Sequence, residues 1–190
     1  MKHFSFVLII LALAGPAFAT STQPAFDALK TKAVDYGPTG QICEQVARLE
    51  LGEKYLPTQY DIAVGVEYAV AGRTIGELDI VIVDKRSNAV ELVGEVKCWK
   101  SVSGGLAKAR KQRARFLRTL SSQPDQIAFK AKEGGAFSSE QFQRSTFIAI
   151  AQNGSKTQGF DMELTYTLRE LMDLRGQLLD CQSQGKCAIP

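Results

Sequence analysis

Two carboxylates and a lysine have a spacing that would bring them together if their segments are strands. Asp79 lies in residues 77–84 (ELDIVIVD), and Glu95 and Lys97 lie in residues 90–99 (VELVGEVKCW). The short turn between these β-branched segments predicts an antiparallel hairpin. Alternate residues of a strand share a face, so Glu95 and Lys97 should point the same way, and the hairpin can place Asp79 beside Glu95.

This trio predicts chemistry that depends on a divalent metal. Two carboxylates at one point repel each other unless a cation lies between them. Their oxygens suit Mg²⁺ or Mn²⁺, which also bind water and substrate phosphates. Lys97 could position or deprotonate water and offset phosphate charge, so the parts needed for phosphodiester hydrolysis are present. The alternative is a strand face with solvated charges, although the apolar neighbours Val93 and Val96 make unpaired charge costly there.

The position of the one histidine excludes several other kinds of hydrolytic site. The chain has 190 residues, and its histidine is His3. Residues 1–19 have the basic start, apolar stretch and small-residue cleavage site (residues 17–19) typical of a secretory signal peptide, and the stretch is too short to span a membrane. The mature chain, expected to begin near Thr20, would have no Ser-His-Asp or Cys-His triad, no imidazole base and no histidine-bound zinc.

The cysteine content fits an exported protein, either periplasmic or secreted. Four cysteines in an oxidising compartment indicate two disulfides. Cys181 and Cys187 enclose a polar loop and could close a small ring in the C-terminal tail, residues 181–190, which would leave Cys43 to meet Cys98. Three connectivities are compatible with the sequence, and the lack of a C-x-x-C pair disfavours a four-thiolate zinc site.

The remaining pattern predicts one domain at residues 40–180, preceded by a loosely held arm at residues 20–39. The expected order is a helix, three strands, a helix, two strands and a last helix that begins at the capping box of Thr167 and Glu170. This order predicts an α/β sheet with helices packed against it. The expected bounds are 40–51, 61–70, 77–84, 90–99, 106–120, 146–151, 162–166 and 167–179.

The segments GELDIVIV (76–83) and ELVGEVK (91–97) resemble the PD-(D/E)xK nuclease superfamily, which includes restriction enzymes and Holliday-junction resolvases. They are especially similar to a small resolvase-like branch with the pattern G-E-[IL]-D-[IL]-[IV] and a later E-V-K. The likeness covers about residues 40–116. It implies a restriction-endonuclease-like fold, a central mixed β-sheet flanked by helices, and cleavage of DNA that depends on Mg²⁺ or Mn²⁺.

The resemblance also implies roles for individual residues. Asp79 and Glu95 would bind the metal together with the carbonyl of Val96, and Lys97 would be the catalytic lysine. The first predicted helix resembles the family's G-x-x-x-E-x-x-A element, so Glu44 would approach the metal directly or through water.

A further, less complete family motif lies in the helix expected at residues 106–120. Gln112 with Phe116 resembles the Q-x-x-x-Y element of the exonuclease-like branch, with phenylalanine in place of tyrosine, and implies a catalytic role for Gln112. The proline that often precedes the aspartate is absent. Glu77 could compete with Asp79 as a ligand.

The helix expected at residues 106–120 carries a candidate nucleic-acid-binding surface. Lysine and arginine contacts to phosphates dominate nucleic-acid affinity. The formal net charge of the chain is only +3, so any basic patch is local. The alternative is a solvated helix face. The candidate residues are Lys108, Arg110, Lys111, Arg113, Arg115 and Arg118.

The leading interpretation is therefore an exported metal-dependent nuclease with DNA as the first choice of substrate and RNA as the second. The second is a non-catalytic nucleic-acid-binding or protein-interaction domain that retains the nuclease fold. The third is a disulfide-stapled envelope protein whose hairpin charges are merely solvated. If Cys43 and Cys98 form a bond, it would tie the helix of Glu44 to the strand of Lys97.

Overall fold

The computed structural model describes residues 21–132 and 136–190. The signal peptide expected at residues 1–19 lies outside these ranges. Within the described ranges, no helix is both long and apolar enough to cross a membrane.

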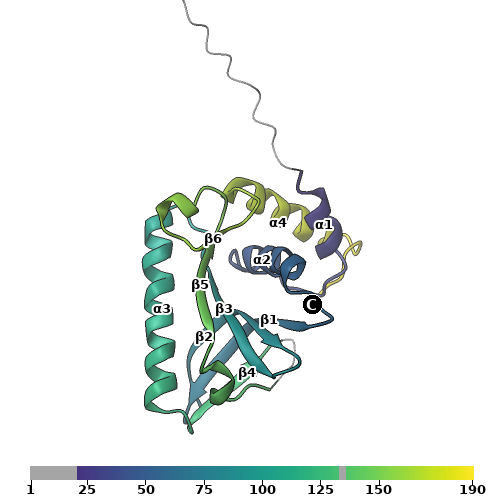
Figure 1. Ribbon diagram of the computed structural model, residues 1–190. Helices are drawn as coiled ribbons and strands as arrows, with labels where there is room; N and C mark the ends of the chain where they lie inside the picture. The colour runs from purple at the N-terminus through teal and green to yellow at the C-terminus, as the bar shows by residue number, and fades with distance from the viewer. Residues whose placement is uncertain (1–20, 133–135) are drawn as a thin grey trace, which may run out of the picture.

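In the described residues, six strands form one mixed sheet in the order β4-β1-β2-β3-β5-β6 (Figure 1). The β4-β1-β2-β3 part is antiparallel, whereas β5 and β6 continue it in parallel from β3. The strands are β1 Tyr60–Val70, β2 Arg73–Asp84, β3 Ala89–Val96, β4 Ile127–Ala131, β5 Thr146–Ala151 and β6 Met162–Glu163.

Helices cover both faces of this sheet. In Figure 1, α1, α2 and α4 lie together on one side and the long helix α3 lies on the other. This arrangement is the expected α/β fold with a restriction-endonuclease-like layout. The helices are α1 Gln23–Leu29, α2 Gln41–Lys54, α3 Val102–Ser122 and α4 Leu168–Ser183, with 3₁₀ turns η1 Ser139–Phe142 and η2 Lys156–Gln158.

Each face of the sheet has its own apolar core. On one side, Ile42 and Val46 of α2 and Leu171 of α4 pack against Ile80 and other sheet residues. On the other, the ring of Phe116 from α3 is fully buried among aromatic residues. The period-2 pattern of the strands supplies both cores, because successive side chains point to opposite faces.

The described residues contain two disulfides, Cys43–Cys98 and Cys181–Cys187. Their presence fits the oxidising compartment expected of an exported protein. The first joins α2 to the segment just after β3, and the second closes the small ring at the end of α4.

Several local expectations need correction. The arm expected to be loosely held contains α1 and packs onto the domain, with Leu29 and Tyr36 each 1% exposed. The strand expected at 90–99 ends at Val96. Helix α3 begins earlier than residue 106, because the side chain of Ser101 accepts a hydrogen bond from the Gly104 amide and caps it. Strand β4 lies in a segment expected to be a loop.

Candidate active site

The β2–β3 hairpin brings the sequence-predicted trio together. Ile80 pairs with Gly94, so Asp79 and Glu95 occupy adjacent positions on neighbouring strands. Lys97 follows the end of β3, where its amide donates to the carbonyl of Ile150 on β5. The three side chains are buried, with exposed fractions of 7%, 3% and 8% in chain order. Buried charges of this kind persist only when they are paired.

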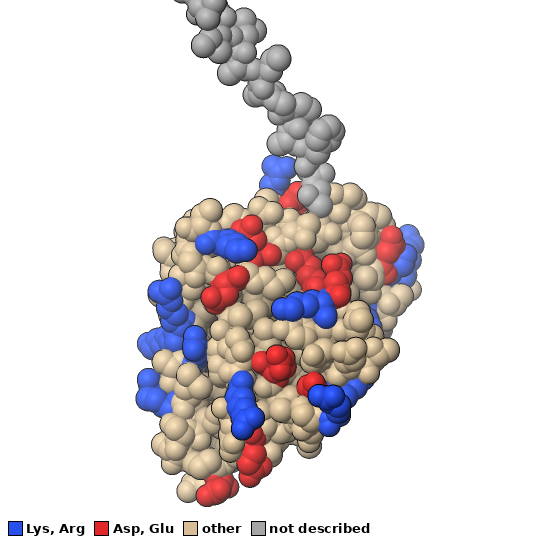
Figure 2. Space-filling view, viewed as in Figure 1, with Lys and Arg blue, Asp and Glu red and all other residues tan. Residues whose placement is uncertain are grey.

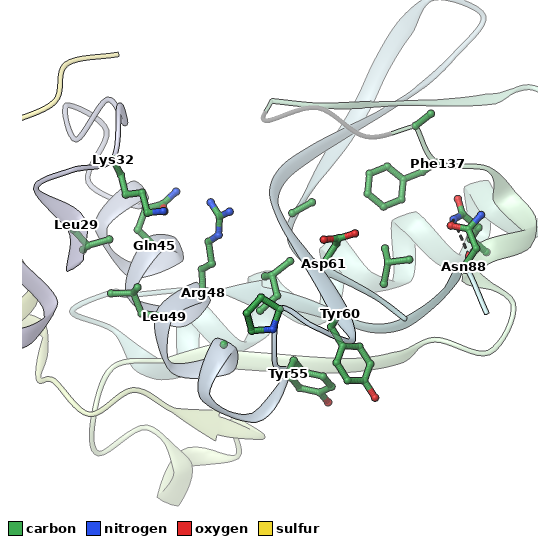
Figure 3. A pocket seen from close by; sticks show the side chains of 17 residues that line it. Leu29, Lys32, Gln45, Arg48, Leu49, Tyr55, Tyr60, Asp61, Asn88 and Phe137 are labelled. Carbon is green, nitrogen blue, oxygen red and sulfur yellow. Dashed lines mark hydrogen bonds between the residues drawn. The ribbon is translucent and has the colours of Figure 1, made fainter. Parts of the chain in front are cut away.

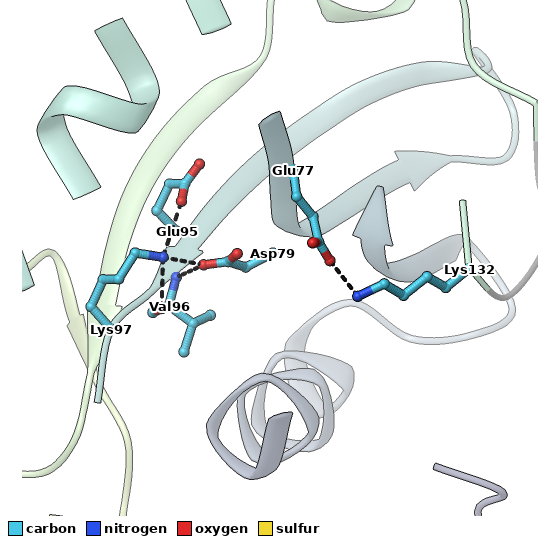
Figure 4. A network of polar contacts seen from close by, with 6 residues as sticks. All are labelled: Glu77, Asp79, Glu95, Val96, Lys97 and Lys132. Atoms are coloured by element: carbon cyan, nitrogen blue, oxygen red, sulfur yellow. Dashed lines mark hydrogen bonds and ion pairs between the residues drawn. The ribbon is translucent and has the colours of Figure 1, made fainter. Parts of the chain in front are cut away.

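The ammonium group of Lys97 joins the two carboxylates (Figure 4). Its Nζ lies 2.6 Å from Oδ2 of Asp79 and 3.3 Å from Oε2 of Glu95. It also donates to the Val96 carbonyl at 2.9 Å, while the Val96 amide donates to Asp79 Oδ2 at 2.7 Å. The lysine therefore supplies the positive charge between the carboxylates, and the backbone fixes the orientation of Asp79.

The pKa values of Glu95 and Lys97 are both shifted from their ordinary values. Burial and the nearby Asp79 carboxylate raise the pKa of Glu95 to about 8, against the opposing effect of Lys97. Burial acts to lower the pKa of Lys97, but Asp79 and Glu95 outweigh it and raise that pKa. Lys97 is thus held as an ammonium ion. Glu95 Oε1 is buried and has no hydrogen-bond partner in the described residues.

Glu44 approaches the same cluster from the first turn of α2. Burial raises its pKa to about 7, with further contributions from the carboxylates of Asp79 and Glu77. Glu44 is thus near enough to Asp79 and Glu77 for their charges to affect its pKa. Its neighbour Cys43 is bonded to Cys98, the residue after Lys97, so one covalent link ties the two elements that carry site residues.

A second lysine, which sequence analysis missed, lies beside the cluster. Lys132 Nζ lies 2.6 Å from Glu77 Oε1, and Figure 4 shows this pair next to Asp79. The Glu77 carboxylate is thus engaged in an ion pair of its own with Lys132. Gly65 of β1 lies against this ion pair. Its φ is +69°, and a Cβ atom at this position would lie 2.8 Å from Glu77 Oε1. Lys132 follows β4, which the sequence pattern did not predict, so no signal marked it.

Gln112 and Phe116 of α3 have different surroundings. Gln112 Oε1 is buried without a hydrogen-bond partner in the described residues, so this oxygen could accept a hydrogen bond from a ligand. The Phe116 ring packs edge-on to Tyr68 at 5.0 Å and Phe142 at 5.3 Å between ring centroids. Phe116 is therefore a core residue, and its environment gives no support for a role equivalent to the family's tyrosine.

The six basic residues predicted to bind nucleic acid are all exposed on α3. Figure 2 shows basic side chains along the edge of the molecule where α3 lies. Some of them contact aromatic rings: Lys108 Nζ lies 4.7 Å from the Trp99 ring centre, and the Arg113 guanidinium lies 5.3 Å from that of Phe147. The helix thus offers a local basic surface on the α3 side of the sheet.

A large hollow lies on another part of the surface (Figure 3). It measures about 680 Å³ and lies between α2 and the ends of β1 and β2, with Arg48, Tyr60 and Phe137 in its lining. Asp79, Glu95 and Lys97 are not among the described residues that line it. The acidic cluster is thus separate from this hollow.

The donor set fits a divalent cation that takes part of its coordination shell from water and substrate. Among the described residues, no group of three or more His, Cys, Asp or Glu side chains is arranged to hold a metal by itself. Glu95 nevertheless has an unpaired buried oxygen, and burial, followed by the neighbouring Asp79 carboxylate, raises its pKa. Mg²⁺ commonly binds through one or two carboxylates together with waters and phosphate oxygens.

In comparisons with known proteins, no family model, curated protein or solved structure matches the chain. The likeness to PD-(D/E)xK nucleases therefore depends on the short motifs around Asp79, Glu95 and Lys97. The fold described above is compatible with that likeness.

Proposed function

We propose that the protein is an exported, metal-dependent nuclease that hydrolyses phosphodiester bonds of DNA. The observation that carries the proposal is the buried cluster of Asp79, Glu95 and Lys97 at the end of a strand hairpin. Carboxylates can hold a divalent metal that polarises a phosphate, and an ammonium group can offset the charge that develops, so this chemistry does not require histidine. The two disulfides support export to an oxidising compartment.

Mg²⁺ or Mn²⁺ would be held by Asp79, Glu95 and the Val96 carbonyl, with Glu44 acting directly or through water. When bound, the metal supplies Lewis-acid polarisation of the phosphate and a lowered pKa of the attacking water. The unpaired Oε1 of Glu95 supports this assignment, because a buried carboxylate oxygen without a partner is costly.

The protein groups around this position are already oriented. The Val96 amide holds Asp79 Oδ2, so this carboxylate needs little reorganisation when substrate arrives. Lys97 keeps its proton at Nζ, as its raised pKa indicates. It would therefore donate hydrogen bonds to a phosphate oxygen or to the attacking water, and offset the charge that develops, rather than act as the base.

The basic surface of α3 would bind the substrate backbone. Its lysine and arginine side chains are exposed and lie on the α3 side of the sheet, the side on which Glu95 and α3 line a common hollow. Phosphate contacts of this kind supply affinity without sequence preference, and they weaken as salt rises.

The test is cleavage of DNA by purified protein with Mg²⁺, with Mn²⁺ and with EDTA. We expect cleavage only with metal and a loss of about a hundredfold or more in Asp79→Asn, Glu95→Gln and Lys97→Gln, because each removes a group that acts on the reacting phosphate. Glu91→Gln is the matched control, since Glu91 is exposed on the same strand as Glu95. Wild-type activity in all three site variants would reject the assignment.

One observation favours a second function, a nucleic-acid-binding or protein-interaction domain without catalysis. Lys97 already neutralises the carboxylates, so the cluster can exist as a structural ion-pair network without a metal. Salt-sensitive DNA binding, with neither Mg²⁺ binding by calorimetry nor cleavage, would establish this alternative.

A further inference from the structure

A small pocket adjoins the candidate active site between α3 and β5. Its volume is about 160 Å³, and Glu95 of the acidic cluster forms part of its lining. Pockets for drug-sized ligands usually measure about 300–1,000 Å³, so this one fits only a small group. The apolar part of its wall consists of Leu106, Ala109, Phe147, Ile148 and Ala149.

Two arginines of α3 lie at this pocket. The Arg113 guanidinium is seated over the ring of Phe147, at 5.3 Å from its centre. The guanidinium of Arg110 lies close to Gly159, where a Cβ atom would be 3.8 Å from Arg110 Nη2. The φ of Gly159 is +94°, a conformation that favours glycine. Both arginines are exposed and can reach a phosphate at the pocket entrance.

The interior chemistry does not suit a bare phosphate ion. Two carboxylates, Glu95 and Asp161, contribute to the lining and would repel a second anion. Asp161 is held in place, because its Oδ2 accepts a hydrogen bond from the Ala149 amide at 2.8 Å. A carboxylate in an apolar wall suits a group with both an apolar face and hydrogen-bond donors, such as a nucleobase or a sugar hydroxyl.

We propose that this pocket takes the base or sugar of one unpaired nucleotide of the substrate strand, with the nucleotide's phosphate at the entrance, next to the phosphodiester bond that the acidic cluster acts on. The proposal rests on the proposed function and adds the substrate class. Arg110 and Arg113 contact the nucleotide's phosphate, Phe147 and the apolar wall contact its base or sugar, and Asp161 accepts a hydrogen bond from it. A base inside a duplex is stacked and paired, so the preferred substrate is single-stranded DNA or a frayed end.

The first test measures binding in EDTA, so that cleavage plays no part. Fluorescence anisotropy compares a single-stranded oligothymidylate with a duplex of equal length at fixed salt. We expect tighter binding of the single strand and a loss of about tenfold or more in Arg110→Gln/Arg113→Gln. The matched control, Arg86→Gln/Arg169→Gln, removes two exposed charges that lie off α3 and outside the pocket, and should cost about threefold or less.

The second test locates the nucleotide. In ¹⁵N-resolved NMR spectra, thymidine 5′-monophosphate should shift the amide signals of Gly159 and Ala149, and Asp161→Asn should weaken this binding. Equal shifts with inorganic phosphate would show an anion site and overturn the nucleotide assignment. Equal affinity for single strand and duplex, or equal losses in the two double variants, would overturn it as well.

Failure of this proposal can be told apart from failure of the proposed function. Nucleotide binding at Gly159 in a protein that never cleaves DNA with Mg²⁺ would reject the proposed nuclease function and support nucleotide binding in the pocket. Metal-dependent cleavage of duplex DNA, with no shift of the Gly159 or Ala149 amide signals, would reject nucleotide binding in the pocket and leave the proposed nuclease function in place.

Discussion

Removal of the Cys43–Cys98 disulfide should reduce the stability of the fold more than removal of Cys181–Cys187. The perturbation is the double variant Cys43→Ala/Cys98→Ala, and Cys181→Ala/Cys187→Ala is the matched control. The two bonds close loops of very different length, with sequence separations of 55 and 6 residues. A crosslink restricts the unfolded chain, and the restriction grows with loop length.

The chain-entropy relation gives the expected magnitudes. For separations of 55 and 6 residues it predicts losses of about 4 and about 2 kcal/mol in the free energy of unfolding at 25 °C. Cys43, a residue of α2, is also only 1% exposed within the core, so the alanine variant loses packing there in addition. The difference between the two variants should therefore be about 2 kcal/mol or more.

The assay is urea denaturation followed by circular dichroism, with Mg²⁺ binding measured separately by calorimetry. Metal affinity should fall in Cys43→Ala/Cys98→Ala, because the bond ties Glu44 to the segment of Lys97, and should be unchanged in the control. Equal stability losses in the two variants would refute the loop-length reasoning. Unchanged metal affinity in the first variant would refute the inference that the bond positions Glu44.

Three further predictions concern single residues. The folded-state pKa of Glu95, about 8, lies above its ordinary value of 4.5, so this group's contribution to the stability of the metal-free protein is fully present below pH 4.5 and is lost as pH rises through 8. In urea melts from pH 5 to 9, Glu95→Gln should be less sensitive to pH than wild type, and an identical pH profile would contradict the assignment. Gly65→Ala should cost more than Gly72→Ala in the same melts, by about 1 kcal/mol or more, because both residues have positive φ but only Gly65 has a close neighbour, Glu77 Oε1. Phe116→Tyr should cost about 1–3 kcal/mol by burying a hydroxyl and should not raise nuclease activity; a gain in activity would restore the family's tyrosine role to this position.

The parts of the site that the sequence predicted are those encoded by local patterns. The β2–β3 hairpin follows from two β-branched segments and a short turn, and period-2 geometry then places Glu95 and Lys97 on one face. The α4 start likewise follows from the capping box of Thr167 and Glu170. Such features need no knowledge of how distant segments pack.

The parts that were missed depend on long-range packing. Strand β4 is short and only half buried, so its five residues carry a weak pattern, and its position follows from pairing with β1. Lys132 could not be assigned to Glu77, which is 55 positions away, without that pairing. The burial of Tyr36 similarly comes from the packing of α1 and the following segment on the domain.

The lengths of the strands also have a consequence for solubility. The two strands at the sheet edges, β4 and β6, have five and two residues, whereas β1 and β2 in the interior have eleven and twelve. An edge strand presents unpaired amide and carbonyl groups that can join the sheet of another molecule. Short edges limit this pairing, and the exposed Lys130 in β4 opposes it further. Where β4 covers Val66–Val70 of β1 and β6 covers Ile150 and Ala151 of β5, the longer strands are kept away from positions where two copies could join into a continuous sheet.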